Sequence, residues 1–234
     1  MNDFVQNIAD RGFAACSHVI DPHAIAEMRE SLPILPSGGL RNALAISELL
    51  AALARADALR ALARSVLGGT ARVTRAILFD KSPNANWRVP WHQDTTIAVK
   101  ERRDVPGFGP WSIKDGVVHV RPPASVLERV LTLRLHLDPC SETNGPLIVL
   151  PGTHRKGFLG EHESRVSIES IVPVTCAADV GDVVAFRPLL MHSSQKAQVA
   201  THRRVLHLEF AVGSPGGALE WNDADPDAPV SADR

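Results

Sequence analysis

The sequence predicts a mainly β protein with helices: a double-stranded β-helix, the cupin-like jelly-roll barrel, with an N-terminal helical buttress. Two observations lead to this prediction. Over roughly the first seventy residues apolar side chains recur at helical spacing, and from Arg72 onward the apolar segments are short, β-branched and separated by Pro, Gly and Asn. Eight such segments after a helical start are typical of two packed sheets with helices against one of them.

The N-terminal part carries clear helix signals. Asp21-Pro22 offers an N-cap followed by a proline at the first helical position, and it predicts a helix that runs to about Ser31. The stretch Ser47–Leu67 is rich in Ala, Leu and Arg, has leucines at helical spacing and is ended by Gly68-Gly69. The first residues, MNDFVQNIADRGF, are also helical in pattern and lack the basic and apolar segments of a secretory signal.

The second part contains the expected strands. These are short apolar runs bounded by turn residues, near Arg72–Phe79, Arg88–His92, Val117–Val120, Leu131–Asp138, Pro146–Leu150, Ser170–Thr175, Asp182–Met191 and Arg203–Ala211. Leucine at every second position of Leu131–Asp138 indicates a strand with one buried face. Asn144-Gly145 indicates a tight turn between two strands. The proline-containing stretch Glu101–Pro123 is too long for a plain hairpin loop, so we expect a lid or binding loop there, around Gly107–Trp111.

These elements predict a single domain over residues 1–212, mostly helical in 1–70 and forming the jelly-roll core in 71–212. Residues 213–234 are rich in Pro, Gly and Asp, and we expect a loosely ordered polar tail.

The composition is that of an ordinary globular protein. Of 234 residues, 44% are hydrophobic and 22% charged, and the net charge of −1 gives no electrostatic reason to expect nucleic acid or an anionic membrane as a partner. No apolar run reaches the roughly 18 residues that cross a bilayer. Cys16, Cys140 and Cys176 are odd in number and far apart, which argues against a disulfide framework and fits a cytoplasmic protein.

His92-Gln93-Asp94 and the distant His192 form the strongest candidate site. Two imidazoles and one carboxylate bind three adjoining corners of an octahedral ion and leave three open, which is the facial triad of non-haem Fe(II) oxygenases. Arg203 follows His192 by 203 − 192 = 11 residues. A guanidinium there could hold the carboxylate of an organic co-substrate through paired hydrogen bonds.

A second tripeptide of the same form, His136-Leu137-Asp138, competes with the first. We prefer His92 and Asp94, because His92 ends the second expected strand and His192 ends the seventh. Strands so far apart in sequence can face each other across a barrel mouth. His136 is then expected to line the barrel or lie in the core.

Arg203 and Arg204 both begin the last expected strand, and only one can point into the barrel because neighbouring residues face opposite sides. The apolar parity of Leu206, Leu208 and Phe210 favours Arg204 if the barrel interior is apolar. The outer face of a sheet covered by helices is apolar too, so parity leaves both arginines open.

The motifs around these residues resemble the phytanoyl-CoA dioxygenase family. The matching pieces are Trp91-His92-Gln93-Asp94, Asn144-Gly145-Pro146-Leu147, Pro151-Gly152-Thr153-His154, Gly181-Asp182 through Pro188–His192, and Arg203-Arg204. The resemblance implies a jelly-roll enzyme that uses Fe(II), 2-oxoglutarate and O2. It implies His92, Asp94 and His192 as iron ligands.

The same resemblance selects Arg203, eleven residues after the distal histidine, as the 2-oxoglutarate arginine, and it implies that Ser194 and Trp111 contact the co-substrate. Related halogenases carry Ala or Gly where this chain has Asp94, so the resemblance favours hydroxylation of an aliphatic C–H. It does not choose between a small molecule and an acyl or carrier-linked substrate.

Two alternatives stay open. One is a metal-dependent isomerase, lyase or hydrolase on the same barrel that does not use 2-oxoglutarate, in which Arg203→Ala would leave turnover largely intact. A zinc hydrolase of this kind usually needs a separate general base, and the sequence does not identify one. The other is a binding module without turnover, which release of succinate would rule out.

Overall fold

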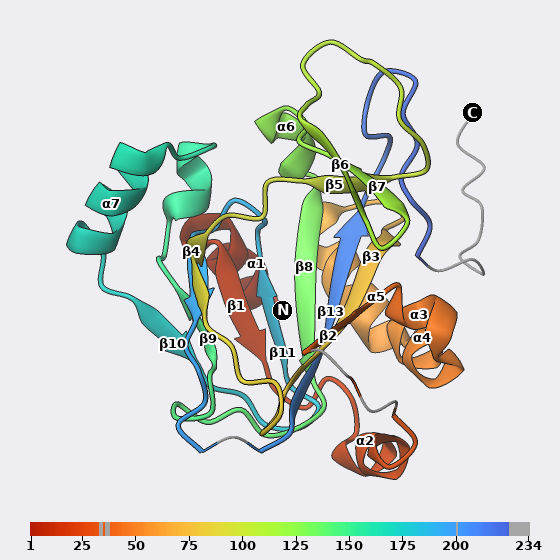
Figure 1. Ribbon diagram of the computed structural model, residues 1–234, viewed down its shortest axis with the longest axis vertical. Coiled ribbons are helices and arrows are strands. Elements are labelled where there is room, and N and C mark those ends of the chain that lie inside the picture. The colour runs from red at the N-terminus through yellow and green to blue at the C-terminus, as the bar shows by residue number, and fades with distance from the viewer. Residues whose placement is uncertain (33–34, 36–37, 200, 225–234) are drawn as a thin grey trace.

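The computed structural model describes residues 1–32, 35, 38–199 and 201–224, and it confirms the predicted jelly roll (Figure 1). Two antiparallel sheets form an open barrel, with strand orders β1-β11-β8-β13-β3-β2 and β10-β9-β12-β4, and a third sheet has the order β5-β7-β6. The strands are β1 (Phe13–Cys16), β2 (Gly39–Arg41), β3 (Arg72–Lys81), β4 (Val89–His92), β5 (Ile97–Val99), β6 (Trp111–Lys114), β7 (Val117–Val120), β8 (Val130–His136), β9 (Leu147–Val149), β10 (Val174–Cys176), β11 (Val183–Phe186), β12 (His192–Ser194) and β13 (Arg203–Ala211).

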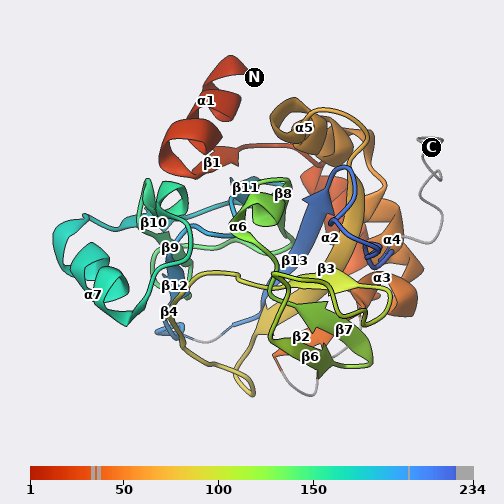
Figure 2. The ribbon, with the colours of Figure 1, turned by 90° about the horizontal axis from the view of Figure 1, so that it is seen from above.

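Helices cover the outer face of the six-stranded sheet (Figure 2). The helices are α1 (Asn2–Arg11), α2 (Pro22–Arg29), α3 (Ala43–Ile46), α4 (Glu48–Ala54), α5 (Asp57–Leu67), α6 (Ala124–Leu127), the 3-10 helix η1 (Thr153–Lys156) and α7 (Glu161–Ser170). Leu206 and Leu208 of β13 pack in one core cluster with Leu50 of α4 and Leu59 of α5. Each fully buried leucine contributes about 1.5–3 kcal/mol to folding, so this outer layer holds the sheet in place.

The opposite face of the same sheet is polar and also buried. The predicted alternation in β8 is correct, and its leucines belong to the helix-facing core. Its polar residues Thr132, Arg134 and His136 are nevertheless buried, because the four-stranded sheet covers them. The six-stranded sheet therefore has an apolar outer face, which the helices cover, and a polar inner face, which lies between the two sheets.

The predicted strand Asp182–Met191 is wrong beyond Phe186. Only β11 belongs to the six-stranded sheet. The next residues turn, with a hydrogen bond of 2.9 Å from Leu190 N to Arg187 O, and the chain enters the four-stranded sheet as β12. Pro188 lacks an N–H and so cannot continue the ladder. An apolar run contains no signal for such a change of sheet, because both segments are fully buried.

Other boundaries differ from the sequence prediction. The helix after Asp21 is confirmed, and the Asp21 side chain accepts a hydrogen bond of 3.0 Å from His23 N. The expected helix Ser47–Leu67 divides into α4 and α5 at Arg55-Ala56. The expected strand Ser170–Thr175 is confirmed only at its end, since Ser170 ends α7 and β10 begins at Val174.

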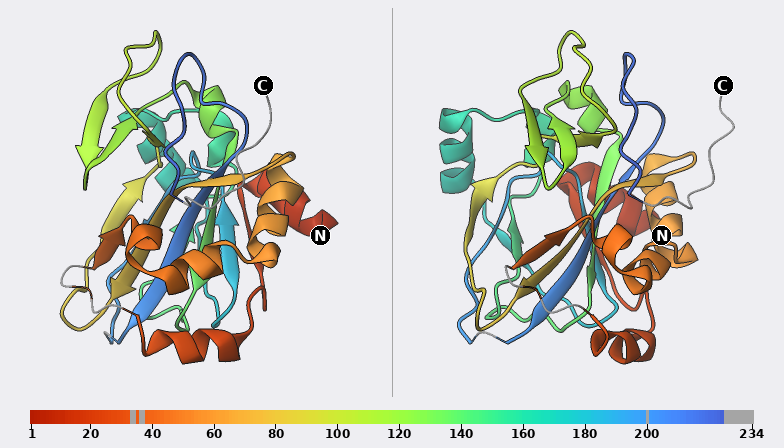
Figure 3. Two further views of the ribbon diagram at one scale, coloured as in Figure 1. Left: turned by 90° about the vertical axis from the view of Figure 1, so that its right-hand side faces the viewer. Right: turned by 45° about the vertical axis from the view of Figure 1, so that its right-hand side comes forward.

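The stretch Glu101–Pro123 contains a β-hairpin, formed by β6 and β7. The loop before it lies at the same end of the molecule as the C-terminal loop (Figure 3). Trp221 in that C-terminal loop is 2% exposed and bridges Val99 of β5. The expectation of a loosely ordered tail is therefore wrong for residues 213–224, and residues 225–234 lie outside the described part. None of the described helices has the length and apolar character that a membrane span requires.

Candidate metal centre and co-substrate cavity

Pairing of two neighbouring strands brings the candidate ligands together. His92 at the end of β4 lies directly opposite His192 at the start of β12, and their ring centroids are 4.1 Å apart. Asp94 follows two residues after His92, and its backbone N donates to Pro188 O over 2.9 Å. The strands of His92 and His192, far apart in the sequence, are adjacent in the barrel; they meet as hydrogen-bonded neighbours of one sheet and not across the barrel mouth.

The three side chains point their ligand atoms at one place. Asp94 places Oδ1 3.8 Å from His92 Nε2 and Oδ2 3.8 Å from His192 Nε2. All three ligand atoms lie within 4.8 Å of one another. Metal–nitrogen bonds of about 2 Å require donors within roughly 4 Å of each other, so these residues fit one ion after a small movement.

Hydrogen bonds set both imidazoles in the tautomer that binds metal. His92 Nδ1 lies 2.9 Å from Pro90 O, and His192 Nδ1 lies 2.9 Å from Leu190 O. A carbonyl oxygen only accepts, so each Nδ1 carries the proton and each Nε2 offers its lone pair toward Asp94. Backbone carbonyls thus orient both rings before any ion binds.

The electrostatics of this group suit a divalent cation. Burial lowers the pKa of His192 to about 4, so its ring is neutral at neutral pH. Burial alone would raise the pKa of Asp94, but His192 and Arg75 outweigh it and the pKa is lowered. Neutral nitrogens with an ionised carboxylate are the protonation states that metal binding requires.

A second group, Asp94, His207 and Glu209, also has ligand atoms close together. Glu209 is already paired with Arg75, and the group shares Asp94 with the first. His92, Asp94 and His192 are therefore the better candidate for a metal site.

Gln93 anchors the segment between the two ligands, a role that sequence reasoning did not assign. Its amide nitrogen donates to Gly157 O over 2.9 Å and to Leu189 O over 2.7 Å. Its amide oxygen accepts from Leu159 N over 2.9 Å. Gln93 thus ties His92 and Asp94 to two loops of the chain.

A cavity opens beside the ligands, and part of its wall is cationic. The polar and charged residues that line it are Lys81, His92, Asp94, Arg134, His192, Ser193, Ser194, Arg203 and His207. Asp94 is the one acidic residue among those described here. Arg203 is 2% exposed and forms a side-chain hydrogen bond with Cys140, but its Nε and Nη1 atoms have no partner.

Lys81 is the second buried cation in this wall, and it pairs only with neutral groups. Its ammonium donates to Ser194 Oγ over 2.6 Å and to Gln195 O. Ser194 Oγ in turn donates to Gly145 O over 2.9 Å. Burial, followed by the charges of Arg203 and Arg134, lowers the pKa of Lys81 to about 7. Three clustered cations with so little negative charge call for an anionic ligand.

Gly145 of the Asn144-Gly145 motif makes room for this lysine. Its φ of +76° is in the left-handed region, and a Cβ there would come 2.7 Å from Gln195 O and 2.8 Å from Lys81 Nζ. The expected tight turn between two strands is present, with a hydrogen bond of 3.4 Å from Asn144 N to Ser141 O, although the flanking strands β8 and β9 belong to different sheets. The glycine also allows the close approach of Lys81.

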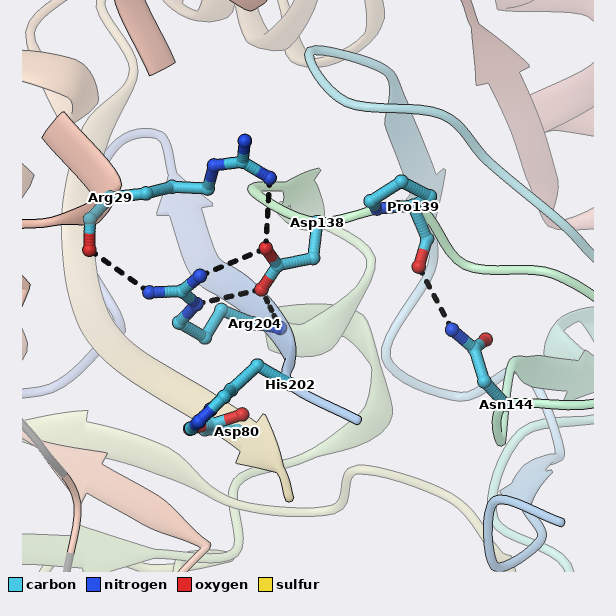
Figure 4. Close-up of polar contacts among 7 residues, drawn as sticks. All are labelled: Arg29, Asp80, Asp138, Pro139, Asn144, His202 and Arg204. Carbon is cyan, nitrogen blue, oxygen red and sulfur yellow. Dashed lines mark hydrogen bonds and ion pairs between the residues drawn. The ribbon is translucent and has the colours of Figure 1, made fainter. Parts of the chain in front are cut away.

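Arg204 does not line the cavity and lies in a network at the ends of the central strands β8 and β13 (Figure 4). Its Nε and Nη2 donate to the Asp138 carboxylate over 2.7 and 2.9 Å, and its Nη1 donates to Arg29 O over 3.0 Å. Asp138 also pairs with Arg29 over 3.1 Å. The two polar side chains of the second His-x-Asp tripeptide therefore lie in different places: Asp138 belongs to this network, and His136 is buried between the sheets.

Asp138→Asn should lower the free energy of unfolding by about 2–3 kcal/mol, somewhat below the usual cost of breaking a buried pair because Arg29 is partly exposed. Arg204 and Arg29 outweigh burial and lower the pKa of Asp138. The stabilisation of the fold by ionised Asp138 is therefore complete above the pKa of about 3.9 that this group has in the unfolded chain. It is lost as pH falls through the lower pKa of Asp138 in the folded protein.

Urea unfolding of the variant at neutral and acidic pH measures this difference. The exposed pair of Arg102 with Asp104 gives the control, since Asp104→Asn should change stability by less than about 1 kcal/mol. Equal stability of Asp138→Asn and the natural protein at neutral pH would contradict the network's role.

Five of the predicted site residues line one cavity: His92, Asp94, His192, Arg203 and Ser194. Trp111 does not line it. It pairs with Val120 in the hairpin and packs outside the cavity, with Arg102 over its ring at 5.6 Å.

Sequence reasoning missed Lys81 and Arg134 as cavity residues. Their signal is weak, because Arg134 is the one charged residue of β8, and Lys81 is one of four charged residues in β3 that the sequence does not distinguish.

Comparison with known proteins identifies a family and relatives that match this sequence. The model of the family described as phytanoyl-CoA dioxygenase (PhyH) matches residues 36–205. L-Proline trans-4-hydroxylase of Streptomyces griseoviridis is 27% identical over 220 residues, covering 80% of this chain and 74% of that protein. Ectoine dioxygenase of Stutzerimonas stutzeri (strain A1501) is 28% identical over 225 residues, covering 83% of this chain and 67% of that protein.

A solved structure shares the fold. The epimerase SnoN, crystallised with Fe3+, alpha ketoglutarate and nogalamycin RO, has a TM-score of 0.71 and 14% sequence identity, covering 100% of this chain and 91% of that one. The family model matches well over half of the sequence, so the chain belongs to the phytanoyl-CoA dioxygenase family.

Proposed function

We propose that this protein is an Fe(II)- and 2-oxoglutarate-dependent dioxygenase that hydroxylates an aliphatic C–H of a small molecule. The observation that carries the proposal is the pairing, in one cavity, of a facial triad with a buried arginine that has unpaired donors. Both relatives carry names of oxygenases that act on small molecules, proline and ectoine, and the SnoN structure holds iron and alpha ketoglutarate.

Each group in the cavity has a distinct task under this proposal. His92, Asp94 and His192 would hold Fe(II) on one side and leave the remaining positions open. Iron and 2-oxoglutarate would supply the oxidation: the oxo acid loses CO2 and becomes succinate while one oxygen atom of O2 enters the substrate. Arg203 and Lys81 would bind the carboxylate that lies away from the metal, with Ser194 beside it.

Apolar side chains form part of the cavity wall. Phe79, Trp87 and Val89 line the cavity, and the Phe186 ring lies tilted against the His192 ring at a centroid distance of 4.9 Å. Low-dielectric surroundings strengthen the attraction between a carboxylate and Arg203. Trp111 would reach the co-substrate only if the β6–β7 hairpin moved toward the cavity.

Anaerobic titration of the apoprotein with Fe(II) and then 2-oxoglutarate should give a weak visible charge-transfer band. His192→Ala should abolish the band, because one of the three ligands is lost. His162→Ala is the control, since His162 is exposed on α7. In air, turnover should release succinate and a product heavier by one oxygen atom.

Two other results would change the assignment. Bound iron without a band would favour the isomerase, lyase or hydrolase that does not use 2-oxoglutarate. Succinate release with a product of unchanged mass would favour epimerisation, the activity named for SnoN.

A further inference from the structure

Arg134 is a buried cation of the cavity wall that has no acidic partner. It lies on the inner face of β8, is 8% exposed and lines the same cavity as His92, Asp94 and His192. Its guanidinium forms no hydrogen bond or ion pair with any residue that the structure describes, and its Nε atom is buried without a partner. A cation held out of water in this way is costly unless a ligand of opposite charge binds it. Arg134 is therefore suited to bind an anion.

The strand register places Arg134 on the metal side of Arg203. β13 lies between β3 and β8 (Figure 1). Arg203 is directly opposite Lys81 of β3, whereas Arg134 is directly opposite His207, which is 207 − 203 = 4 residues farther along β13. Four residues of a strand span about 13 Å. A ring nitrogen of His207 lies within 4.8 Å of a carboxylate oxygen of Asp94. The side chain of Arg134 therefore starts near the metal ligands and at a distance from Lys81.

The guanidinium of Arg134 reaches the middle of the cavity. Its Cζ atom lies 5.8 Å from the ring centroid of Phe79, so the side chain crosses β13, which separates β8 from β3. Phe79 is directly opposite Val205, which is midway between Arg203 and His207 in β13. The guanidinium thus lies between the metal ligands and Arg203.

The proposed co-substrate has two carboxylates, and the cavity wall has three cations. Arg203 and Lys81 are assigned to the carboxylate away from the metal, here called the far carboxylate. The near carboxylate belongs to the 2-oxo acid group, and such a group chelates a metal ion through its keto oxygen and one carboxylate oxygen. The second oxygen of the near carboxylate is then buried and negatively charged, and it needs a hydrogen-bond donor.

The metal ligands cannot supply this donor. The Nδ1 atoms of His92 and His192 already donate to backbone carbonyl oxygens, and an ionised Asp94 only accepts. Ser193 lines the cavity with an unpartnered hydroxyl, but a hydroxyl brings no positive charge. Arg134 offers both a donor and a charge at the middle of the cavity.

We infer that Arg134 is a further catalytic residue, which binds the near carboxylate of 2-oxoglutarate while Arg203 and Lys81 bind the far carboxylate. The inference rests on the proposed function, because it concerns the co-substrate of that reaction. A guanidinium donates from a planar fork of N–H groups, so Arg134 also fixes the orientation of the oxo acid next to the metal. The co-substrate is then held at both ends by arginine.

The test compares two oxo acids on the full-length protein loaded anaerobically with Fe(II). 2-Oxoglutarate carries both carboxylates, and 2-oxopentanoate carries only the near one. Arg134→Met should weaken the binding of both compounds by about tenfold or more, the loss of one charge-assisted hydrogen bond. Arg203→Met should weaken the binding of 2-oxoglutarate alone. Affinities are read from the charge-transfer band.

The position of the charge-transfer band gives a second readout, and it needs only saturating 2-oxoglutarate. The transition moves negative charge from iron to the oxo acid, and a cation beside that group lowers the energy of the excited state. Arg134→Met should therefore move the absorption maximum to shorter wavelength, and Arg203→Met should leave it in place. A merely structural role of Arg134 predicts no such difference between the two variants.

Arg204→Met is the matched control, because Arg204 lies outside the cavity and pairs with Asp138. It should change neither the affinities nor the band. Arg134→Gln should repeat the pattern of Arg134→Met and so excludes an effect of one poorly folded variant. Binding of Fe(II) alone, measured by calorimetry, should be no weaker in either Arg134 variant, because a nearby positive charge has been removed.

Two results overturn the inference. If Arg134→Met weakens binding of 2-oxoglutarate but not of 2-oxopentanoate, Arg134 binds the far carboxylate together with Arg203 and Lys81. If it weakens neither and leaves the band in place, Arg134 binds a group of the primary substrate or no ligand. Either result refutes this inference alone, whereas bound iron without any band in the natural protein refutes the proposed function and this inference with it.

Discussion

Arg203→Met should weaken 2-oxoglutarate binding by roughly 100-fold or more, because two charge-assisted hydrogen bonds of about 1.5–3 kcal/mol each are lost. The same substitution should not destabilise the protein without its co-substrate. Arg203 is buried beside Lys81 and Arg134 with two unpaired nitrogen atoms, and removing such a cation relieves desolvation and repulsion. The apoprotein should therefore unfold at the same or a higher temperature.

Arg204→Met is the matched comparison and should give the opposite pattern. Arg204 adjoins Arg203 in β13, but its guanidinium donates hydrogen bonds to Asp138 and to Arg29 O. We expect unchanged affinity for 2-oxoglutarate and lower thermal stability. Affinity is read from the anaerobic charge-transfer band and stability from thermal unfolding. If Arg204→Met removed co-substrate binding while Arg203→Met did not, the assignment of the cavity arginine would be wrong.

Binding of 2-oxoglutarate should weaken as pH rises above about 7, and Lys81 is the expected cause. Its pKa is about 7 in the empty cavity because of burial, Arg203 and Arg134. A bound carboxylate favours the ammonium form and raises that pKa. The contribution of Lys81 to affinity is thus complete below pH 7 and is lost as pH rises through the higher pKa of the complex, by at most about tenfold per pH unit.

Three measurements isolate this effect, each a dissociation constant followed from about pH 6.5 to about pH 8.5. Lys81→Met should bind 2-oxoglutarate weakly with little pH dependence. Lys81→Arg should retain affinity without the slope, because a guanidinium does not titrate there. The mono-acid 2-oxopentanoate lacks the distant carboxylate and should show no slope with the natural protein. A slope that persists in Lys81→Arg would exclude Lys81 as its source.

Periodicity was enough to predict the architecture. Alternation in Leu131–Asp138 and the change of pattern at Arg72 indicated strands that the structure contains as β8 and β3. The short strands β1, β2, β5, β6 and β12 were not predicted. Their pairing partners, such as β11 for β1, lie far away in the sequence.

The alternation of apolar residues along β13 could not decide whether Arg203 or Arg204 points into the barrel. Leu206 and Leu208 indicate which face of β13 is apolar, but not whether that face is the barrel interior or the surface under the helices. The resemblance to a family selected Arg203, and the structure places that residue in the cavity and Arg204 beside Asp138.

The sequence by itself determined the jelly-roll class and the residue types for a metal site, because both depend on spacing along the chain. Strands show apolar residues at every second position, and the histidine and carboxylate ligands stand two residues apart. Only the tertiary structure decided that Lys81 and Arg134 share the cavity wall with Arg203. The physical reason is that the groups around a buried charge decide whether it destabilises the fold or binds a ligand of opposite charge. Those surroundings come from strands β3, β8 and β13, which meet only when the chain folds.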